Sequence, residues 1–252
     1  MGAWSEVDSR HFLEVGRFYV PQRERQLAII ATLVPRLPQA AAVIDLCCGE
    51  GLLAEAILAA QPETTVLGLD GSLAMRETAQ RHLAHFAQRF RTAGCDLHHL
   101  ALPDHAPLRA IVSSLALHHV EHRAKPALYR QLRAALAPGG ALLVADLVRP
   151  ASAAGRELAA TGWDAAVRAA DAAAGAGGAA WQRFQRERWN WFRYPDEADR
   201  PAPIADELDW LRAAGLEAVD VCWSDCGHAV FGGFAPPTAP SSESSPLGSG
   251  EG

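Results

Sequence analysis

Short apolar runs alternate with amphipathic stretches through the first 150 residues of the chain. Runs at residues 42–47, 65–69, 109–114 and 141–147, and a weaker one at 90–95, are typical of strands buried on both faces of a sheet. Helices are predicted between them at residues 52–60, 72–88 and 125–136, with Ser72 as a cap and Pro138-Gly139-Gly140 ending the last one. This alternation predicts a doubly wound α/β fold around a mostly parallel sheet.

The pattern changes after Pro150, where no strand is predicted for more than forty residues. Helices are predicted at residues 151–194, interrupted at Gly175–Gly178, and at 204–214, ended by Gly215; strands are predicted at 216–225 and 228–234. The last two strands meet at a Cys226-Gly227 turn, and a turn this tight makes the pair antiparallel. We therefore expect a seven-stranded sheet with an antiparallel C-terminal hairpin.

These elements divide the chain into three parts. Residues 1–40 are expected to form an N-terminal helical cap, and residues 41–235 one α/β domain, in which residues 151–201 are a helical and aromatic lid inserted after the fifth strand. Residues 236–252 are rich in Pro, Ser and Gly and are expected to be a disordered tail, because they cannot bury enough apolar surface to order themselves.

Length, charge and composition limit the kinds of partner molecule and the cellular location that we expect. The 252 residues suit one large domain, and a formal net charge of -6 provides no general attraction to nucleic acid or to an anionic membrane. No apolar stretch is long enough to cross a bilayer, and the polar N-terminus lacks the apolar core of a signal peptide. Five cysteines, two of them adjacent, do not form a disulfide framework, so a cytoplasmic location is expected.

The most informative segment is VIDLCCGEG at residues 43–51. An apolar strand runs into a turn with Gly49 and Gly51, where the backbone can approach a ligand and the next helix presents free N–H groups. Neither the G-x-G-x-x-G pattern of dinucleotide binders nor a phosphate-loop G-K-[ST] is present. Asp70, at the end of the second predicted strand, is placed to accept hydrogen bonds from two ribose hydroxyls. The pattern favours a ribose ligand without a pyrophosphate over an ordinary strand-to-helix turn.

Five segments then carry a family resemblance: VIDLCCGEG, LGLDGSLAM, CDL, AIVSSLALHHV and LAPGGALLVAD. In order and spacing they resemble the class I S-adenosylmethionine-dependent methyltransferases, over residues 43–147 and more weakly through DWLRAAGLEAV and the final hairpin. The resemblance implies a Rossmann-like fold, S-adenosyl-L-methionine as cofactor, and methyl transfer to an O, N or C nucleophile of a small molecule. The chain departs from the family at Cys47, where glycine is usual.

The resemblance also implies roles for individual residues. Asp45 orients the glycine turn and reaches the methionine ammonium through water, Asp70 binds the ribose, Asp96 and Leu97 contact the adenine, and residues 114–115 lie beside the methionine part. The predicted cofactor-binding residues are Asp45, Cys47, Cys48, Gly49, Gly51, Asp70, Gly71, Ser72, Asp96, Leu97, Ser114, Leu115 and Tyr19. For Tyr19 two interpretations stay open: it closes over the cofactor, or it anchors the core.

Candidates for the acceptor side follow the fourth strand. His118 and His119 are predicted to be catalytic, because histidine accepts a proton near neutral pH; the alternative is a packing role, which fits His119 better. Residues predicted to line the substrate pocket are Trp189, Trp191, Arg193, Tyr194 and His228. The alternative for the lid is that Trp189 and Phe192 pack one helix face onto the core. No metal is expected, because Cys222, Cys226 and His228 share a strand face but lack a fourth ligand.

Other functions remain as alternatives. The same cofactor site serves other transfers, such as carboxymethyl transfer, and also non-catalytic regulatory proteins that bind S-adenosylmethionine. An RNA or protein methyltransferase is disfavoured by the acidic charge, and the N-P-P-Y signature of amino-group methylation is absent where SSLALHH stands. We expect a small-molecule substrate, no nucleic acid or membrane partner, and a monomer or homodimer.

Overall fold

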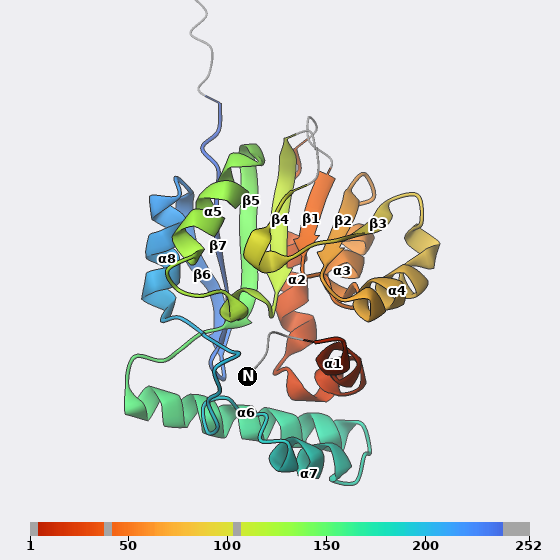
Figure 1. Cartoon of the computed structure of the whole chain (residues 1–252), viewed down its shortest axis with the longest axis vertical. Helices are drawn as coiled ribbons and strands as arrows, with labels where there is room; N and C mark the ends of the chain where they lie inside the picture. Colours follow the sequence, from red (N-terminus) through yellow and green to blue (C-terminus); the bar gives the residue numbers. More distant parts are fainter. Residues whose placement is uncertain (1–4, 38–41, 103–106, 239–252) are drawn as a thin grey trace, which may run out of the picture.

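A seven-stranded sheet forms the centre of the molecule. The computed structural model describes residues 5–37, 42–102 and 107–238, with the strands in the order β3-β2-β1-β4-β5-β7-β6 (Figure 1). The strands are β1 Ala42–Leu46, β2 Thr65–Asp70, β3 Phe90–Gly94, β4 Leu108–Ser114, β5 Leu136–Leu147, β6 Glu217–Asp225 and β7 His228–Phe234. Strands β1 to β5 pair in parallel, and β7 runs antiparallel to both β5 and β6. The Rossmann-like fold and its antiparallel C-terminal hairpin are confirmed.

Helices cover both faces of the sheet and one of its ends. They are α1 Glu6–Tyr19, α2 Arg23–Leu33, α3 Leu52–Ala60, α4 Leu73–His82, α5 Lys125–Ala134, α6 Ala153–Ala173, α7 Ala179–Arg186 and α8 Ile204–Ala213. Helices α2, α3 and α4 pack on one face, and α5 and α8 on the other. Helices α6 and α7 lie across the end of the sheet at the bottom of Figure 1, with α1 beside them. No described helix is long and apolar enough to cross a membrane.

The two-sided core explains the apolar strands. Along β1, Val43 joins the cluster on the α2–α3 face and Ile44 the cluster on the α5–α8 face. Along β4, Val112 and Ile111 divide in the same way. Since successive side chains of a strand point to opposite faces, both faces demand apolar residues, and the strand appears as a continuous apolar run.

A buried ion pair joins the helices on the α5–α8 face. Lys125 of α5 is paired with Glu207 of α8, and the Tyr129 hydroxyl also donates to Glu207. The Lys125 side chain is 1% exposed. Breaking such a pair by removing one partner leaves an unpaired buried charge, so this contact fixes how α5 and α8 meet.

Two predicted element ends were wrong. The fifth helix ends at Ala134, and β5 begins at Leu136, so Pro138-Gly139-Gly140 lies inside the strand. The β4–β5 register shifts at this point, and Gly139 has φ +76, so the three residues form an irregularity of the sheet edge and not a helix stop. Helix α4 ends at His82, followed by a short 3₁₀ turn, and not at residue 88.

The final hairpin turn agrees with its prediction. Cys226 and Gly227 have φ values of 49° and 73°, the left-handed pair that suits a two-residue hairpin. Most of the predicted disordered tail, residues 239–252, lies outside the described residues.

Candidate active site

Left-handed backbone gathers at one edge of the sheet. After β1, Cys47, Gly49 and Gly51 have φ values of 57°, 54° and 87°, and after β4, Leu115 has φ 57°. Strands β1 and β4 are neighbours whose connections lead to opposite sides, which is the switch point where ligands of doubly wound sheets bind. Cys47 holds a conformation that glycine adopts without strain, so a glycine suits this position well.

Asp70 organises the glycine turn. One carboxylate oxygen accepts the Gly49 N–H at 2.9 Å and the other accepts the Ser72 N–H at 2.8 Å. Burial raises the pKa of Asp70. Each oxygen keeps a further lone pair for a ligand hydroxyl. Ser72 also caps α4 as predicted, since its hydroxyl accepts the Met75 N–H at 3.2 Å.

Asp45 is the most unusual carboxyl group of this edge. Its side chain is 1% exposed, and Oδ2 has no hydrogen-bond partner among the described residues. Burial raises its pKa to about 8, and the charge of Asp70 adds to the effect, while a hydrogen bond from Ala54 and the charge of Arg23 oppose it. Without a ligand, Asp45 therefore holds its proton at neutral pH.

The remaining predicted cofactor residues lie in this turn or at the ends of β2, β3 and β4. Cys48 is buried against Gly68, where an added Cβ would lie 2.7 Å from the Cys48 Sγ. Asp96 follows β3 and caps a short 3₁₀ turn at residues 97–99, accepting the His98 N–H at 2.9 Å. Leu97 is partly buried beside the α5–α8 core. Gly71 is exposed, and Ser114 is half-buried at the end of β4. These roles stay predictions.

The N-terminal cap reaches this site, which no sequence motif indicated. Glu6 of α1 accepts the Leu73 and Ala74 N–H groups at 2.6 and 3.3 Å and the Ser72 hydroxyl at 3.0 Å, so it caps α4. Arg23 of α2 donates from Nη1 to Glu50, inside the glycine turn, at 2.9 Å. No local pattern marks Glu6 or Arg23, because their partners lie far along the chain.

A second cluster of titratable groups forms where β4 and β5 end. His118 Nδ1 lies 2.5 Å from Asp146, its Nε2 lies 3.5 Å from Asp199, and His119 Nδ1 lies 3.1 Å from the same Asp199 carboxylate. Burial disfavours the charged form of His118, but Asp146 and Asp199 outweigh it and raise its pKa. One ring nitrogen of each histidine and a carboxylate oxygen of Asp199 lie within 4.8 Å of one another, as a metal site requires.

The expected division between the two histidines does not match their burial. The His118 side chain is 9% exposed and that of His119 is 19% exposed, so His118 is the more buried of the two, and the roles of both stay predictions. Asp146 and Asp199 escaped prediction because they join this cluster from β5 and from the end of the lid. Cys222, Cys226 and His228, whose spacing raised the question of a metal, form no such cluster within the described ranges.

His228 is buried in the protein interior. It is 1% exposed, packs edge-on against Trp163 with ring centroids 4.8 Å apart, and its Nδ1 lies 3.0 Å from the Cys226 carbonyl oxygen. Burial lowers its pKa to about 4, so the ring is neutral. A ligand reaches this side chain only if the surrounding residues open.

Tyr19 anchors the N-terminal cap to the lid. It is fully buried, its hydroxyl donates to Glu187 at 3.1 Å, and its ring packs on Phe184 and Trp189. Burial raises its pKa. These contacts are those of a core anchor, and the predicted contact of Tyr19 with the cofactor stays a prediction.

The predicted lid residues differ in what they contact. Trp189 packs on Tyr19, and Arg193 is paired with Asp164 at 2.7 Å. Tyr194 is exposed, whereas the buried Trp191 Nε1 has no partner in the described chain. Helix α7 ends at Arg186, so the segment that carries these residues is a series of turns and not the helix that one alternative assumed.

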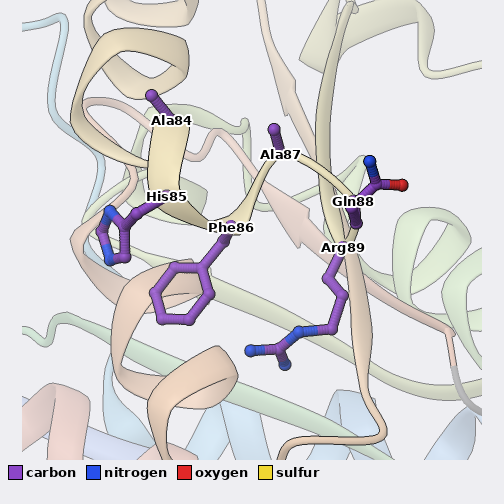
Figure 2. Close-up of a pocket in the computed structure, with 6 residues that line it drawn as sticks. All are labelled: Ala84, His85, Phe86, Ala87, Gln88 and Arg89. Carbon is purple, nitrogen blue, oxygen red and sulfur yellow. The ribbon is translucent and has the colours of Figure 1, made fainter.

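Two surface hollows are lined by residues other than the predicted cofactor residues. One of about 400 Å³ is lined by Ala84 to Arg89, at the turn between α4 and β3 (Figure 2). Another of about 100 Å³ lies in the lid, where Arg193 and Tyr194 contribute to its wall. Neither is lined by Asp45, Asp70 or the glycine turn.

Comparison with known proteins finds similarity to methyltransferases. Residues 43–140 match the family model described as a methyltransferase domain. An uncharacterized methyltransferase of Mycobacterium tuberculosis is 36% identical over 123 residues, which are 49% of this chain and 58% of the relative. Trans-aconitate 2-methyltransferase of Variovorax paradoxus is 37% identical over 128 residues, 51% of this chain and 46% of the relative. The chain thus matches less than two thirds of these relatives' length.

Solved structures share the fold. An O-methyltransferase family protein from Burkholderia thailandensis superposes with a TM-score of 0.62 at 16% identity, covering 92% of this chain and 60% of that one. Human N-acetylserotonin methyltransferase, in complex with S-adenosylmethionine, superposes with a TM-score of 0.60 at 14% identity, covering 92% and 57%. At these identities the likeness shows the fold alone.

Proposed function

Because residues 43–140 make the chain a member of the class I S-adenosylmethionine-dependent methyltransferase family, we propose that it transfers a methyl group from S-adenosylmethionine to an O, N or C nucleophile of a small molecule. The observation that carries the proposal is the pair of buried acids at the switch point. Asp70 keeps lone pairs for two ribose hydroxyls while it holds the Gly49 and Ser72 N–H groups, and Asp45 has an oxygen without a partner in the described chain.

These residues fit the cofactor in charge and in hydrogen-bonding capacity. Asp70 accepts the ribose hydroxyls, and Asp45, once ionised, stabilises the ammonium of the methionine part. The bound cofactor supplies an electrophilic methyl group on a sulfonium, and the protein supplies position.

We assign the acceptor side to the cluster of His118, His119, Asp146 and Asp199. An O or N acceptor loses a proton during the reaction, and His119 is the stronger candidate to take it because its ring is more exposed than that of His118. Asp199 lies 3.1 Å from His119 Nδ1 and orients the ring. In the lid, Tyr194 is exposed and Trp191 keeps an N–H donor unpaired among the described residues, so we place these two against the acceptor.

Titration calorimetry and a methyl-transfer assay test the proposal. The folded chain is titrated with S-adenosylmethionine and with S-adenosylhomocysteine, and then incubated with methyl-labelled cofactor and a panel of small phenols, carboxylates and amines. We expect micromolar binding and label transfer to at least one class. His119→Ala should lower turnover by about 100-fold while the cofactor Kd changes less than twofold.

Two results would contradict the proposal in different ways. If the folded protein binds neither form of the cofactor, the proposed cofactor site is refuted. Tight binding without transfer to any acceptor class favours the regulatory-binder alternative. An exposed histidine that is not among the predicted site residues, His85, provides the matched control, since His85→Ala should change neither quantity.

A further inference from the structure

The cluster at the ends of β4 and β5 has the donor atoms of a transition-metal site. His118 and His119 lie in a 3₁₀ turn, Leu117–His119, after β4, and Asp199 comes from the C-terminal end of the lid. One ring nitrogen of each histidine and one carboxylate oxygen lie within 4.8 Å of one another. Two imidazoles and a carboxylate form a donor set that suits zinc and similar divalent transition metals, whereas Mg²⁺ and Ca²⁺ prefer oxygen ligands alone.

The distances in this cluster are close to those between the ligands of a single ion. Zinc binds nitrogen and oxygen ligands at about 2.0 to 2.2 Å, so two ligands of a tetrahedral site lie about 3.3 Å apart. His119 Nδ1 lies 3.1 Å from Asp199 Oδ1, and His118 Nε2 lies 3.5 Å from the same oxygen. Small rotations of these side chains therefore suffice for one ion to contact all three, with water as a fourth ligand.

Asp146 holds the His118 ring in the orientation that a metal ligand needs. Its Oδ1 lies 2.5 Å from His118 Nδ1, and its Oδ2 accepts the His118 backbone N–H at 2.9 Å. With the Nδ1 proton directed at this carboxylate, Nε2 faces Asp199 Oδ1, and a cation is needed between them. A metal-binding histidine almost always donates its other ring N–H to a carboxylate or a carbonyl oxygen in this way. The neighbouring His119 nitrogen makes the position suitable for a metal ion as well as for a proton.

Backbone contacts hold the end of the lid against the histidine turn. The Arg200 N–H donates to the His118 carbonyl oxygen at 2.6 Å, and Arg200 Nη1 donates to the His119 carbonyl oxygen at 3.2 Å. His122 Nε2 lies 3.0 Å from the Arg200 carbonyl oxygen. These contacts place Asp199 beside both rings before any ion arrives, so little conformational entropy is lost on binding.

We propose that His118, His119 and Asp199 bind one zinc ion or a similar divalent transition metal, with Asp146 orienting His118, and that the bound ion inhibits methyl transfer. A metal ion on His119 Nδ1 leaves Nε2 as an N–H donor, so the ring no longer accepts a proton from an acceptor molecule. The inhibition rests on the proposed function, whereas the metal site does not. The sequence predicted no metal because this donor set forms only when the end of the lid meets the turn after β4.

Zinc binding is measured on the full chain, without an affinity tag, after treatment with EDTA. Calorimetry gives the stoichiometry and the Kd for Zn²⁺, and the visible spectrum of added Co²⁺ reports its coordination. We expect the wild-type chain to bind one equivalent of Zn²⁺ with a Kd of about 1 μM or lower. Asp199→Asn and His119→Ala should each raise this Kd by at least about 10-fold, the effect that residues which only orient the ligands already have.

His99 provides the matched control. It too follows another histidine, His98, and its Nδ1 lies 2.8 Å from Asp96, but these three side chains form no metal-sized cluster within the described residues. His99→Ala should therefore leave the Kd for Zn²⁺ unchanged. Circular dichroism checks the fold of each variant, and added Zn²⁺ should raise the thermal midpoint of the wild-type chain but not that of Asp199→Asn.

The effect on catalysis is measured with an acceptor that the methyl-transfer assay identifies. Saturating Zn²⁺ should lower the turnover of the wild-type chain by at least about 10-fold, because the proton acceptor is lost. EDTA should restore turnover, and the Kd for S-adenosylmethionine should change less than twofold. Zn²⁺ at the same concentration should leave the turnover of Asp199→Asn unchanged.

The possible failures are distinguishable. If the wild-type chain binds no Zn²⁺, or if either Asp199→Asn or His119→Ala keeps the wild-type Kd, the metal site is refuted; where one variant does not fold, the other decides. Zinc binding that leaves turnover unchanged or raises it refutes the inhibitory role. If no acceptor is methylated, the proposed function fails, and the Kd values for Zn²⁺ still decide the metal site.

Discussion

The two halves of the site are built from contacts of different reach. At the ends of β1 and β2, Asp70 holds the backbone N–H groups of Gly49 and Ser72, which belong to the turns beside it. At the ends of β4 and β5, His118 is paired with Asp146 and lies near Asp199, which is close to the C-terminal end of the lid. The first half, at the ends of β1 and β2, is the proposed cofactor side, and its Asp70 contacts are to backbone N–H donors. The second half, at the ends of β4 and β5, is the proposed acceptor side, and it joins side chains from three segments. Cofactor binding should therefore tolerate changes to the lid, whereas acceptor chemistry should not.

The largest expected effect is on the first half. If Asp70 accepts the two ribose hydroxyl groups as proposed, Asp70→Ala removes both hydrogen bonds, and we expect the Kd for S-adenosylmethionine to rise by about 1,000-fold, since each hydrogen bond to a charged group contributes about 1.5 to 3 kcal/mol. Calorimetry on folded variant protein measures it. The control is Glu77→Ala, an exposed acid on α4. An unchanged Kd for Asp70→Ala would place the cofactor elsewhere.

The second half should respond to His118→Ala with a loss of stability. The substitution leaves Asp146 buried without its ion-pair partner, so we expect the free energy of unfolding to fall by about 3 kcal/mol. Urea denaturation at pH 7 measures the change. His119→Ala is the comparison and should cost less than about 1 kcal/mol, because its ring is more exposed. Equal losses in the two variants would show that both histidines pack in the same way.

The number of protons released when the cofactor binds at neutral pH tests the part of the site around Asp45. Asp45 has a pKa of about 8 in the unliganded protein, so an ammonium bound to it displaces a proton, and cofactor binding at pH 7 should release about one proton. Calorimetry in phosphate and in Tris, whose ionisation enthalpies differ, measures the release. Asp45→Asn should release none.

The same carboxyl group sets a trend in stability. The ordinary pKa of an aspartate side chain is 3.8, whereas that of Asp45 in the folded protein is about 8. Between about pH 4 and pH 8 the folded state therefore keeps a proton that the unfolded state has lost. Asp45 therefore makes the free energy of unfolding of the unliganded protein fall as pH rises through that window. A wild-type chain and an Asp45→Asn variant with identical pH dependence there would refute this.

The smallest expected effect concerns the link between cap and lid. Tyr19→Phe removes one hydrogen bond to Glu187 and should lower the free energy of unfolding by about 1 kcal/mol, with the cofactor Kd unchanged. Thermal unfolding and calorimetry measure the two quantities. A large rise in the cofactor Kd would instead indicate that Tyr19 contributes to cofactor binding.

What the sequence predicted correctly depends on local contacts, in whichever half of the site they lie. The strands, the glycine turn and Asp70 were predictable because strand periodicity and turn chemistry are local, and their order along the chain carries the family resemblance. Asp146, Asp199, Glu6 and Arg23 were not, because each acts on a partner in another segment that only the folded chain brings near. The Pro138-Gly139-Gly140 error has the same origin: a local helix-stop signal was overridden by pairing of β5 with β4.

The buried ion pair between α5 and α8 has a practical consequence. Lys125 is the only lysine of the chain, and its amine is enclosed with Glu207. Reagents that acylate lysine side chains therefore meet none on the folded surface. Slow acylation of Lys125, followed by mass spectrometry, reports how often these two helices separate, and it does so at a single atom.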